Sequence, residues 1–394
     1  MSSDLIARVG SEVSRVSPEV VDTRRDLHRH PELAHLEHRT AEMAGGRCRD
    51  LGFEVRTGVG GTGVLAELEG SGPGPTVLYR ADMDALPVDE RDDGRPVRSE
   101  VPGAMHACGH DGHVAIALGV AAVMASLRDS WRGRLRVCFQ PAEEVATGAL
   151  PMIEDGALSG VDRALGIHLW TGLDRGRVAV ATGPIFGSAD EFRLRVRGRG
   201  GHGGLPHLSV DPVLAAAHVV VALQSLVSRE VAPSMPAVVT VGQIRGGQAF
   251  NVIAEEVELR GTVRAPDEEL RRRLLTRVEE LARSVASGLR AEADFELLAG
   301  CPPVINDAVV ADGVRLAAAR AVGEENVQVA GMLTVGDDMA YFLERVPGCY
   351  FLVGAGDPAQ NVRAPHHHPE FDIDERCLGV GVAAVSHALL ASLQ

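Results

Sequence analysis

The stretch EFRLRVRG (191–198) alternates polar and apolar residues, which is typical of a β-strand with one face exposed to solvent. It opens a pattern of strand, helix, strand, strand, helix, strand that continues to about residue 298. The later elements are expected at 211–228 (helix), 237–244 and 255–264 (strands), 267–288 (helix) and 291–298 (strand). The order β-α-β-β-α-β is that of the ferredoxin-like unit. We therefore predict a compact α+β domain over residues 188–298.

The segments on either side of this unit alternate helix and strand. Strands are expected at 76–81, 134–140, 163–170 and 349–354, and helices at 18–30, 37–51, 113–127, about 148–155, 307–322 and 375–392. Such alternation is typical of an α/β domain with a largely parallel sheet. The chain is therefore expected to form a discontinuous α/β domain, 1–187 and 299–394, with the smaller domain inserted into it.

Composition limits the classes of function. The chain has 394 residues, 45% of them hydrophobic and 24% charged, as in ordinary soluble globular proteins. A net charge of -15 argues against binding to nucleic acid or to anionic membranes. The sequence contains no lysine, so a lysine Schiff base or lysine general base is excluded.

Targeting signals and cysteine spacing bear on location. The first residues lack an apolar core of signal-peptide length, and no uninterrupted apolar run approaches membrane-spanning length. The six cysteines are scattered, without a C-x-x-C pair, which argues against a disulfide scaffold. We therefore expect a cytoplasmic protein.

The stretch MHACGHDGH (105–113) concentrates candidate metal ligands. Cys108 and His110 are two residues apart, so both would point to one side of an extended backbone. Thiolate and imidazole groups suit zinc and related metals. A loop that is rich in histidine by chance is the alternative interpretation.

A second candidate stretch, FQPAEE (139–144), follows a predicted strand and presents Glu143 and Glu144. One carboxylate could bind an ion while its neighbour takes a proton from water that the ion makes acidic. The alternative is a solvated pair at the start of a helix.

Two further segments supply histidines. His168 follows apolar residues in the predicted strand LGIHLW, and PHHHPEFD (365–372) offers three adjacent histidines. In open α/β sheets, ligands gather at the carboxyl ends of the strands, where YRADMD (79–84) and FQPAEE also place polar side chains. A core histidine and a polar loop are the alternatives. Taken together, these segments hold about enough donors for two metal ions, with one carboxylate left as a base.

Seven motifs then occur in order across nearly the whole chain: RRDLHRHPEL, YRADMDALPV, PGAMHACGHDGHVA, FQPAEE, GRGGHGGLPH, NVIAEEVELRGTVR and PHHHPEFDIDE. In these motifs the sequence resembles the aminoacylase, hippurate hydrolase and auxin-conjugate hydrolase branch of the dinuclear-metal exopeptidases. The resemblance implies a zinc-exopeptidase-like catalytic domain with an inserted ferredoxin-like lid or dimerisation domain, and a homodimer. It also implies two divalent ions, zinc before manganese, cobalt or nickel, and hydrolysis of the amide of an N-acyl-L-amino acid.

The resemblance assigns roles by position. The metal ligands would be Cys108, His110, Glu144, His168 and His367, the last preferred among three adjacent histidines because it lies two residues before Pro369. Glu143 would be the general base. Asp82 matches an aspartate that orients a metal-binding histidine, although Arg80 stands in the place of that histidine.

Three residues of the inserted domain also match. His202 would polarise the scissile carbonyl from the neighbouring subunit, while Asn251 and Arg264 would hold the substrate, Arg264 through its carboxylate. A tight glycine-rich turn and a solvated strand arginine are the alternatives for His202 and Arg264. Other functions that fit the motifs are an N-acetyl-diaminopimelate deacetylase, a dipeptidase or carboxypeptidase, and a metal-binding scaffold without activity.

Overall fold

The structure is a computed structural model. It describes residues 1–91, 94–357, 359, 362 and 364–393. The chain divides into two compact units. The larger comprises Met1–Ile185, Ile305–Gly331 and Asp338–Gln394, and the smaller comprises Phe186–Val304 and Met332–Asp337. The smaller unit extends past the predicted end at residue 298, because its last strand continues to Cys301.

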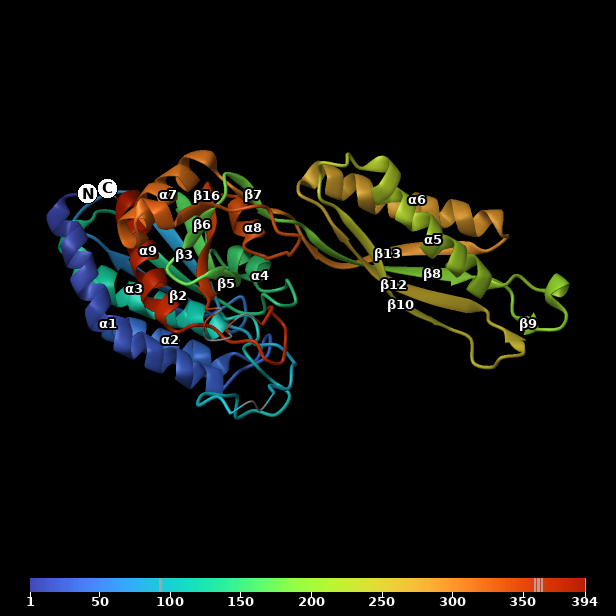
Figure 1. The fold of residues 1–394 in the computed structure, drawn as a ribbon, viewed down its shortest axis with the longest axis horizontal. Coiled ribbons are helices and arrows are strands. Elements are labelled where there is room, and N and C mark those ends of the chain that lie inside the picture. The colour runs from blue at the N-terminus through green and yellow to red at the C-terminus, as the bar shows by residue number, and fades with distance from the viewer. Residues whose placement is uncertain (92–93, 358, 360–361, 363, 394) are drawn as a thin grey trace. The chain divides into compact units, whose positions relative to one another are not determined.

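The larger unit is built on an eight-stranded sheet with the strand order β1-β2-β4-β3-β5-β16-β6-β15 (Figure 1). Its strands are β1 (Glu54–Val59), β2 (Gly63–Glu69), β3 (Thr76–Asp82), β4 (Arg134–Gln140), β5 (Arg163–Asp174), β6 (Val178–Val180), β15 (Val327–Val329) and β16 (Gly348–Gly356). Strands β4, β3, β5 and β16 are parallel to one another, whereas β1, β2 and β6 join antiparallel neighbours. The prediction of a largely parallel sheet therefore holds only for the centre.

No prediction covered the β1–β2 hairpin. Most residues of β1 are exposed, so that strand lacks the apolar alternation by which a strand is recognised. The hairpin also contains a register shift between Thr57 and Val59, which interrupts the pattern further.

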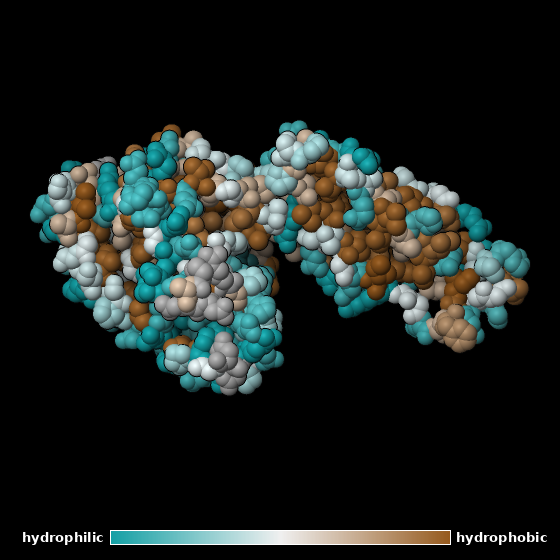
Figure 2. Space-filling model, in the orientation of Figure 1, coloured by the Kyte–Doolittle hydropathy of each residue, from teal (hydrophilic) through white to brown (hydrophobic). Residues whose placement is uncertain are grey.

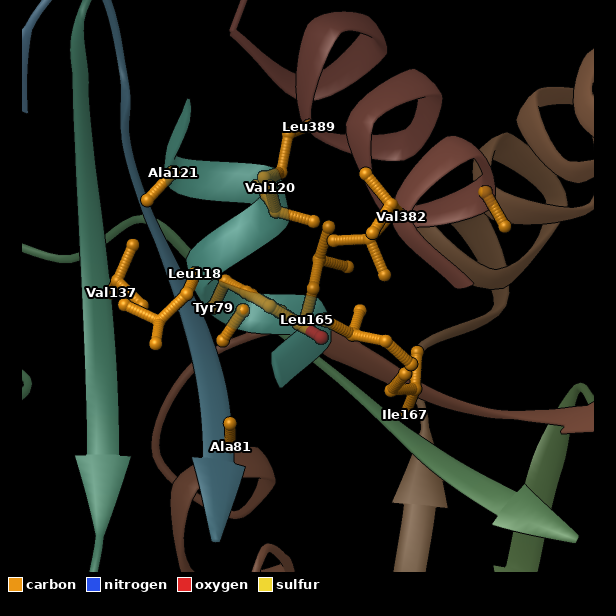
Figure 3. Close-up of a cluster of buried hydrophobic side chains, with 14 of the residues drawn as sticks. Tyr79, Ala81, Leu118, Val120, Ala121, Val137, Leu165, Ile167, Val382 and Leu389 are labelled. Atoms are coloured by element: carbon orange, nitrogen blue, oxygen red, sulfur yellow. The ribbon is translucent and has the colours of Figure 1, made fainter. Parts of the chain in front are cut away.

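Helices cover the sheet of the larger unit: α1 (Ser3–Arg29), α2 (His38–Asp50), α3 (His110–Ser126), α4 (Ala149–Glu154), α7 (Ala308–Val322), α8 (Ala340–Leu343) and α9 (Arg376–Ser392). Alternate residues of the central strands, such as Tyr79 and Leu165, pack with Val120 of α3 and Val382 of α9 in one buried core (Figure 3). This packing fixes α3, whose first residues belong to the candidate site.

The predicted start of the first helix at Pro18 was wrong, because α1 begins at Ser3 and Pro18 lies inside it. Its apolar side chains, among them Val9, Val20 and Leu27, are buried in the core. That burial outweighs the one backbone hydrogen bond that a proline inside a helix removes.

The smaller unit is the predicted β-α-β-β-α-β arrangement. Its elements are β8 (Ala189–Arg197), α5 (Pro212–Glu230), β10 (Val238–Gly246), β12 (Glu256–Arg264), α6 (Glu268–Gly288) and β13 (Glu292–Cys301). The four strands form an antiparallel sheet in the order β10-β12-β8-β13. Two short pairs complete the strands, β9 (Gly201–His202) with β11 (Val252–Ile253) and β7 (Gly183–Phe186) with β14 (Val304–Asn306).

By length and composition alone, α5 could cross a membrane. Its buried residues, including Ala215, Val219 and Leu223, pack in the separate core of the smaller unit. Asp211 caps its first turn by accepting hydrogen bonds from the amides of Val213 and Leu214. These features are those of an ordinary amphipathic helix.

Candidate metal centre

Cys108 and His110 lie on either side of Gly109, whose left-handed backbone (φ 90°) forms the N-cap of α3. The prediction of an extended backbone here was wrong, because α3 begins at His110 rather than at residue 113. Glycine allows this conformation at little cost. The turn directs both side chains to one place, where their donor atoms and one from His168 lie within 4.8 Å of one another.

A second group shares Cys108. Donor atoms of Cys108, Glu144 and His367 also lie within 4.8 Å of one another, and His367 Nε2 is 3.4 Å from Glu144 Oε2. Cys108 Sγ is 3.5 Å from His168 Nε2. All five predicted ligands therefore meet around one sulfur atom, although they come from four separate segments of the chain.

Within the tract of three histidines, His367 lies beside Cys108 and Glu144, whereas His366 makes other contacts. Its backbone amide donates to the carbonyl of Ala107 at 2.8 Å, and its own φ is 68°. His366 instead stacks on Trp170 with ring centroids 4.3 Å apart and donates from Nε2 to the carbonyl of Leu169. A positive φ in a residue other than glycine is uncommon, and the contacts on both sides hold His367 in it.

His168 lies inside β5 rather than at its end, since the strand continues to Asp174. The pairing of β5 with β3, however, extends only to the Arg80–Gly166 pair. His168 therefore lies just beyond the part of β5 that β3 covers, and its Nδ1 donates to the carbonyl of Leu169 at 2.7 Å. This hydrogen bond leaves Nε2 directed toward Cys108.

Asp82, the last residue of β3, contacts His113, for which no role was predicted. His113 Nδ1 is 2.5 Å from Asp82 Oδ1, and His113 Nε2 accepts the amide N–H of Leu169 at 2.9 Å. The proton of His113 is therefore on Nδ1, which donates to the carboxylate. Arg80 donates to the other oxygen of Asp82 at 2.6 Å, whereas His110 Nε2 is 3.8 Å away. Asp82 thus bonds to His113 and not to a candidate ligand.

Glu143 lies beside the ligands. One of its carboxylate oxygens is 3.9 Å from His110 Nε2, and an oxygen of Glu144 is equally far from the same nitrogen. Both residues follow the end of β4, as predicted. A carboxylate that is next to the ligand set but outside the two groups around Cys108 is placed as a base would be.

The surroundings shift the pKa values of the ligands, some upward and some downward. Burial raises the pKa of Cys108 well above its usual value, and Glu144 and Glu143 add to this. Burial also raises the pKa of Glu144, to about 7, against the opposing effect of His110. Burial alone would lower the pKa of His110, but Asp82 and other carboxylates raise it to about 10. Burial lowers the pKa of His168 well below its usual value and also lowers that of His367, which favours the neutral imidazole that binds a metal ion.

Two buried atoms test whether the residues fit a metal ion. His110 Nε2 and Glu144 Oε1 are 3.9 Å apart, and neither has a hydrogen-bond partner among the described residues. Unpartnered polar atoms in a protein interior are rare and cost free energy. A divalent ion would satisfy both, and thiolate, imidazole and carboxylate are the donors that zinc uses. The residues fit such an ion.

The smaller unit brings two of its three candidate residues together. His202 on β9 pairs with Val252 on β11, and the amide of Gly203 donates to the carbonyl of Asn251 at 2.8 Å. The amide of Gly204 donates to His202 Nδ1 at 2.9 Å, so the proton of this exposed ring is on Nε2.

Arg264 lies elsewhere in the smaller unit. It is the last residue of β12, beside Ala265, which bonds to Ser188 where the chain enters the unit. His202 and Asn251 lie near the opposite end of β12, which is about 26 Å away for eight residue steps along a strand. Burial lowers the pKa of the half-buried Arg264 guanidinium.

The chain is similar to several known proteins. Residues 78–391 match the sequence profile of peptidase family M20/M25/M40. The chain is 38% identical over 367 residues to N-acetyl-L-cysteine deacetylase of Bacillus subtilis, covering 93% of this chain and 86% of that protein. It is 35% identical to thermostable carboxypeptidase 1 of Saccharolobus solfataricus, covering 98% of both chains. The crystal structure of the YXEP protein of Bacillus subtilis, a dinuclear metal-binding peptidase, superposes with a TM-score of 0.84 at 32% identity, covering 96% of this chain and 99% of that chain.

Proposed function

The chain belongs to peptidase family M20/M25/M40, and from this premise we propose that it is a metal-dependent amidohydrolase that cleaves the amide of N-acyl-L-amino acids. The observation that carries the proposal is the meeting of five donors around Cys108 with Glu143 beside them. The similarity to a deacetylase of N-acetyl-L-cysteine, itself an N-acyl amino acid, supports this class of substrate.

The proposed cofactors are two divalent ions, which the two groups of donors that include Cys108 would hold. One would be held with His110 and His168, and the other with Glu144 and His367. The thiolate favours zinc, and manganese, cobalt or nickel are alternatives. Ions bound here supply Lewis acidity, which makes water nucleophilic near neutral pH and polarises a carbonyl group.

Side chains of the protein carry out proton transfer, stabilise developing charge and bind the substrate. Glu143 takes a proton from the attacking water and passes it to the nitrogen of the leaving amino acid. His202, with its proton on Nε2, donates a hydrogen bond to the carbonyl oxygen as negative charge develops there. Arg264 binds the substrate carboxylate as a bidentate partner, and Asn251 holds the substrate through its amide.

A homodimer is part of the proposal, and the spacing inside the smaller unit supports it. One small substrate cannot reach both His202 and Arg264 of the same unit, because the length of β12 separates them. A second copy of the chain would supply His202. Exposed apolar side chains on α5, namely Val213, Leu214 and Val221, support an interface, and Figure 2 shows apolar residues gathered on a face of this unit.

The proposed location is the cytoplasm. All six cysteines are free and buried, as is usual for proteins of a reducing compartment. The acidic net charge of -15 supports a soluble enzyme with small-molecule substrates and without nucleic-acid or membrane partners.

The test is a hydrolysis panel with metal-reconstituted protein. The panel contains N-acetyl- and N-benzoyl-amino acids, N-acetyl-diaminopimelate, dipeptides and a carboxypeptidase substrate. We expect turnover of N-acyl amino acids that disappears with a chelator and returns with zinc or manganese. Preferred turnover of N-acetyl-diaminopimelate or of peptides would assign the site to those rival reactions, and an inactive metal-loaded protein would exclude the proposal.

A further inference from the structure

The loop that carries Glu143 and Glu144 is held through its backbone. Three successive amides, those of Ala142, Glu143 and Glu144, donate to carboxylate oxygens. The amides of Glu143 and Glu144 each donate to a different oxygen of Asp84 at 3.0 Å. The amide of Ala142 donates to Glu37 at 2.9 Å. Three consecutive backbone N–H groups therefore donate hydrogen bonds to two carboxylates, those of Asp84 and Glu37.

Both acceptors are buried in the larger unit. Glu37 is 0% and Asp84 1% exposed. Glu37 also accepts hydrogen bonds from the amide of His35 at 3.0 Å and from the hydroxyl of Thr62 at 2.5 Å. A buried carboxylate costs free energy unless such bonds satisfy it. The loop amides are therefore part of what makes burial of these two groups tolerable, and the loop and the carboxylates fix each other.

Asp84 also reaches the ligand set through its backbone. Its carbonyl oxygen accepts a hydrogen bond from His110 Nδ1 at 2.8 Å. This hydrogen bond places a proton on Nδ1 and leaves Nε2, which faces Glu144, as the nitrogen that an ion would bind once its proton is displaced. One residue thus holds the base, one ligand carboxylate and one ligand imidazole.

We propose that Asp84 and Glu37 are positioning residues that fix the loop after β4, so that Glu144 points into the metal centre while Glu143 stays beside it. A carboxylate suits this task because two adjacent N–H groups need two acceptor oxygens, whereas an amide side chain offers one. The role of Glu144 as a ligand and of Glu143 as a base rests on the function proposed above.

The test uses isosteric variants of the full-length protein loaded with cobalt. Asp84→Asn removes one acceptor and places an N–H₂ group against a loop amide. We expect an altered cobalt absorption spectrum, and losses of about 10- to 100-fold in metal affinity and in kcat, as is typical when an outer partner of a ligand is removed. KM should change by less than about threefold, because substrate contacts stay in place.

Glu32→Gln is the matched control. Glu32 accepts the adjacent amides of Arg39 and Thr40 at 2.9 and 2.8 Å, at the start of α2. Its substitution removes the same kind of acceptor and should lower the melting temperature, while the cobalt spectrum and kcat stay unchanged. The control separates loss of stability from loss of positioning.

Glu37→Gln is measured alongside, since it alters the acceptor of the Ala142 amide while Asp84 stays intact, and it keeps the test available if Asp84→Asn does not fold. The proposal fails if the folded variants give the cobalt spectrum and affinity of Glu32→Gln. If the wild-type protein binds cobalt but hydrolyses nothing in the panel, the proposed function fails, and the spectral comparison still decides whether Asp84 and Glu37 position Glu144.

Discussion

The candidate residues of the two units differ in what holds them. In the larger unit Cys108, His110 and His168 are buried and fixed by bonds from the backbone and from other side chains. In the smaller unit His202 and Asn251 are exposed, and a two-residue strand pair with a few local hydrogen bonds orders them. The first group is therefore arranged by contacts within its own unit.

This difference in burial determines which candidate residues can be tested from the structure of a single chain. A buried donor set can be tested by asking whether its unpartnered atoms fit an ion, as His110 Nε2 and Glu144 Oε1 do. The exposed ring of His202 offers no such test, because it is accessible to solvent. Experiments that separate metal binding from turnover therefore probe the two regions independently.

The largest effect is expected from Glu143→Gln, which should remove activity without disturbing the buried centre. General acid–base catalysis contributes about 10²- to 10⁴-fold, so we expect kcat to fall by roughly 10³-fold. Metal content per chain, measured by elemental analysis, and the melting temperature should match wild type, because the glutamine has the same size. Near-full turnover of the variant would remove Glu143 from the role of base.

The next effect tests the exposed region. His202→Ala removes a donor to the developing oxyanion and should lower kcat by about 10²- to 10³-fold with unchanged metal content. If His202 acts across a dimer, a purified heterodimer of His202→Ala with Glu143→Gln contains one intact site and should recover about half of wild-type activity. Absence of recovery in the heterodimer would contradict action across subunits.

The same contrast explains which features could be predicted from the sequence. Local patterns sufficed where one element determines itself, as for α5 with Asp211 and Pro212 at its start, or β4 followed by Glu143. The donor residues could be assigned because their motifs resemble those of a known family, although His168 lies inside β5 and Cys108 and His110 lie at the start of α3.

Features that depend on distant residues could not be predicted. The turn at Gly109 and the course of α1 through Pro18 are set by packing, which local periodicity does not record. Glu37 carries no motif, and the amide that it accepts lies 105 residues further along the chain. His113 stands in the sequence HDGH, but its hydrogen bonds to Asp82 and to the amide of Leu169 in β5 could be recognised only in the folded structure.

A third prediction sharpens the division inside the smaller unit. Arg264→Lys replaces a bidentate fork by a point charge and should raise KM about 30-fold, corresponding to about 2 kcal/mol of lost binding to the carboxylate. Substrates whose carboxylate is replaced by a carboxamide should be hydrolysed equally by variant and wild type. An equal loss on both substrates would show that Arg264 does not bind the carboxylate.

The last prediction concerns pH and returns to the buried centre. Burial holds the pKa of the Cys108 thiol well above its usual value, so between pH 6 and 8 the thiol is protonated and an ion must displace that proton. Metal affinity should therefore rise at least tenfold per pH unit over this window, because each displaced proton contributes a factor of ten. The raised pKa of His110, about 10, adds a second proton to the exchange. Titrations with zinc in a series of buffers measure the slope, and His202→Ala should give the wild-type slope, since the exposed region takes no part in holding the ion. An affinity independent of pH would mean that Cys108 does not bind as a thiolate, and the sulfur at which the two ligand groups meet would then not be a ligand.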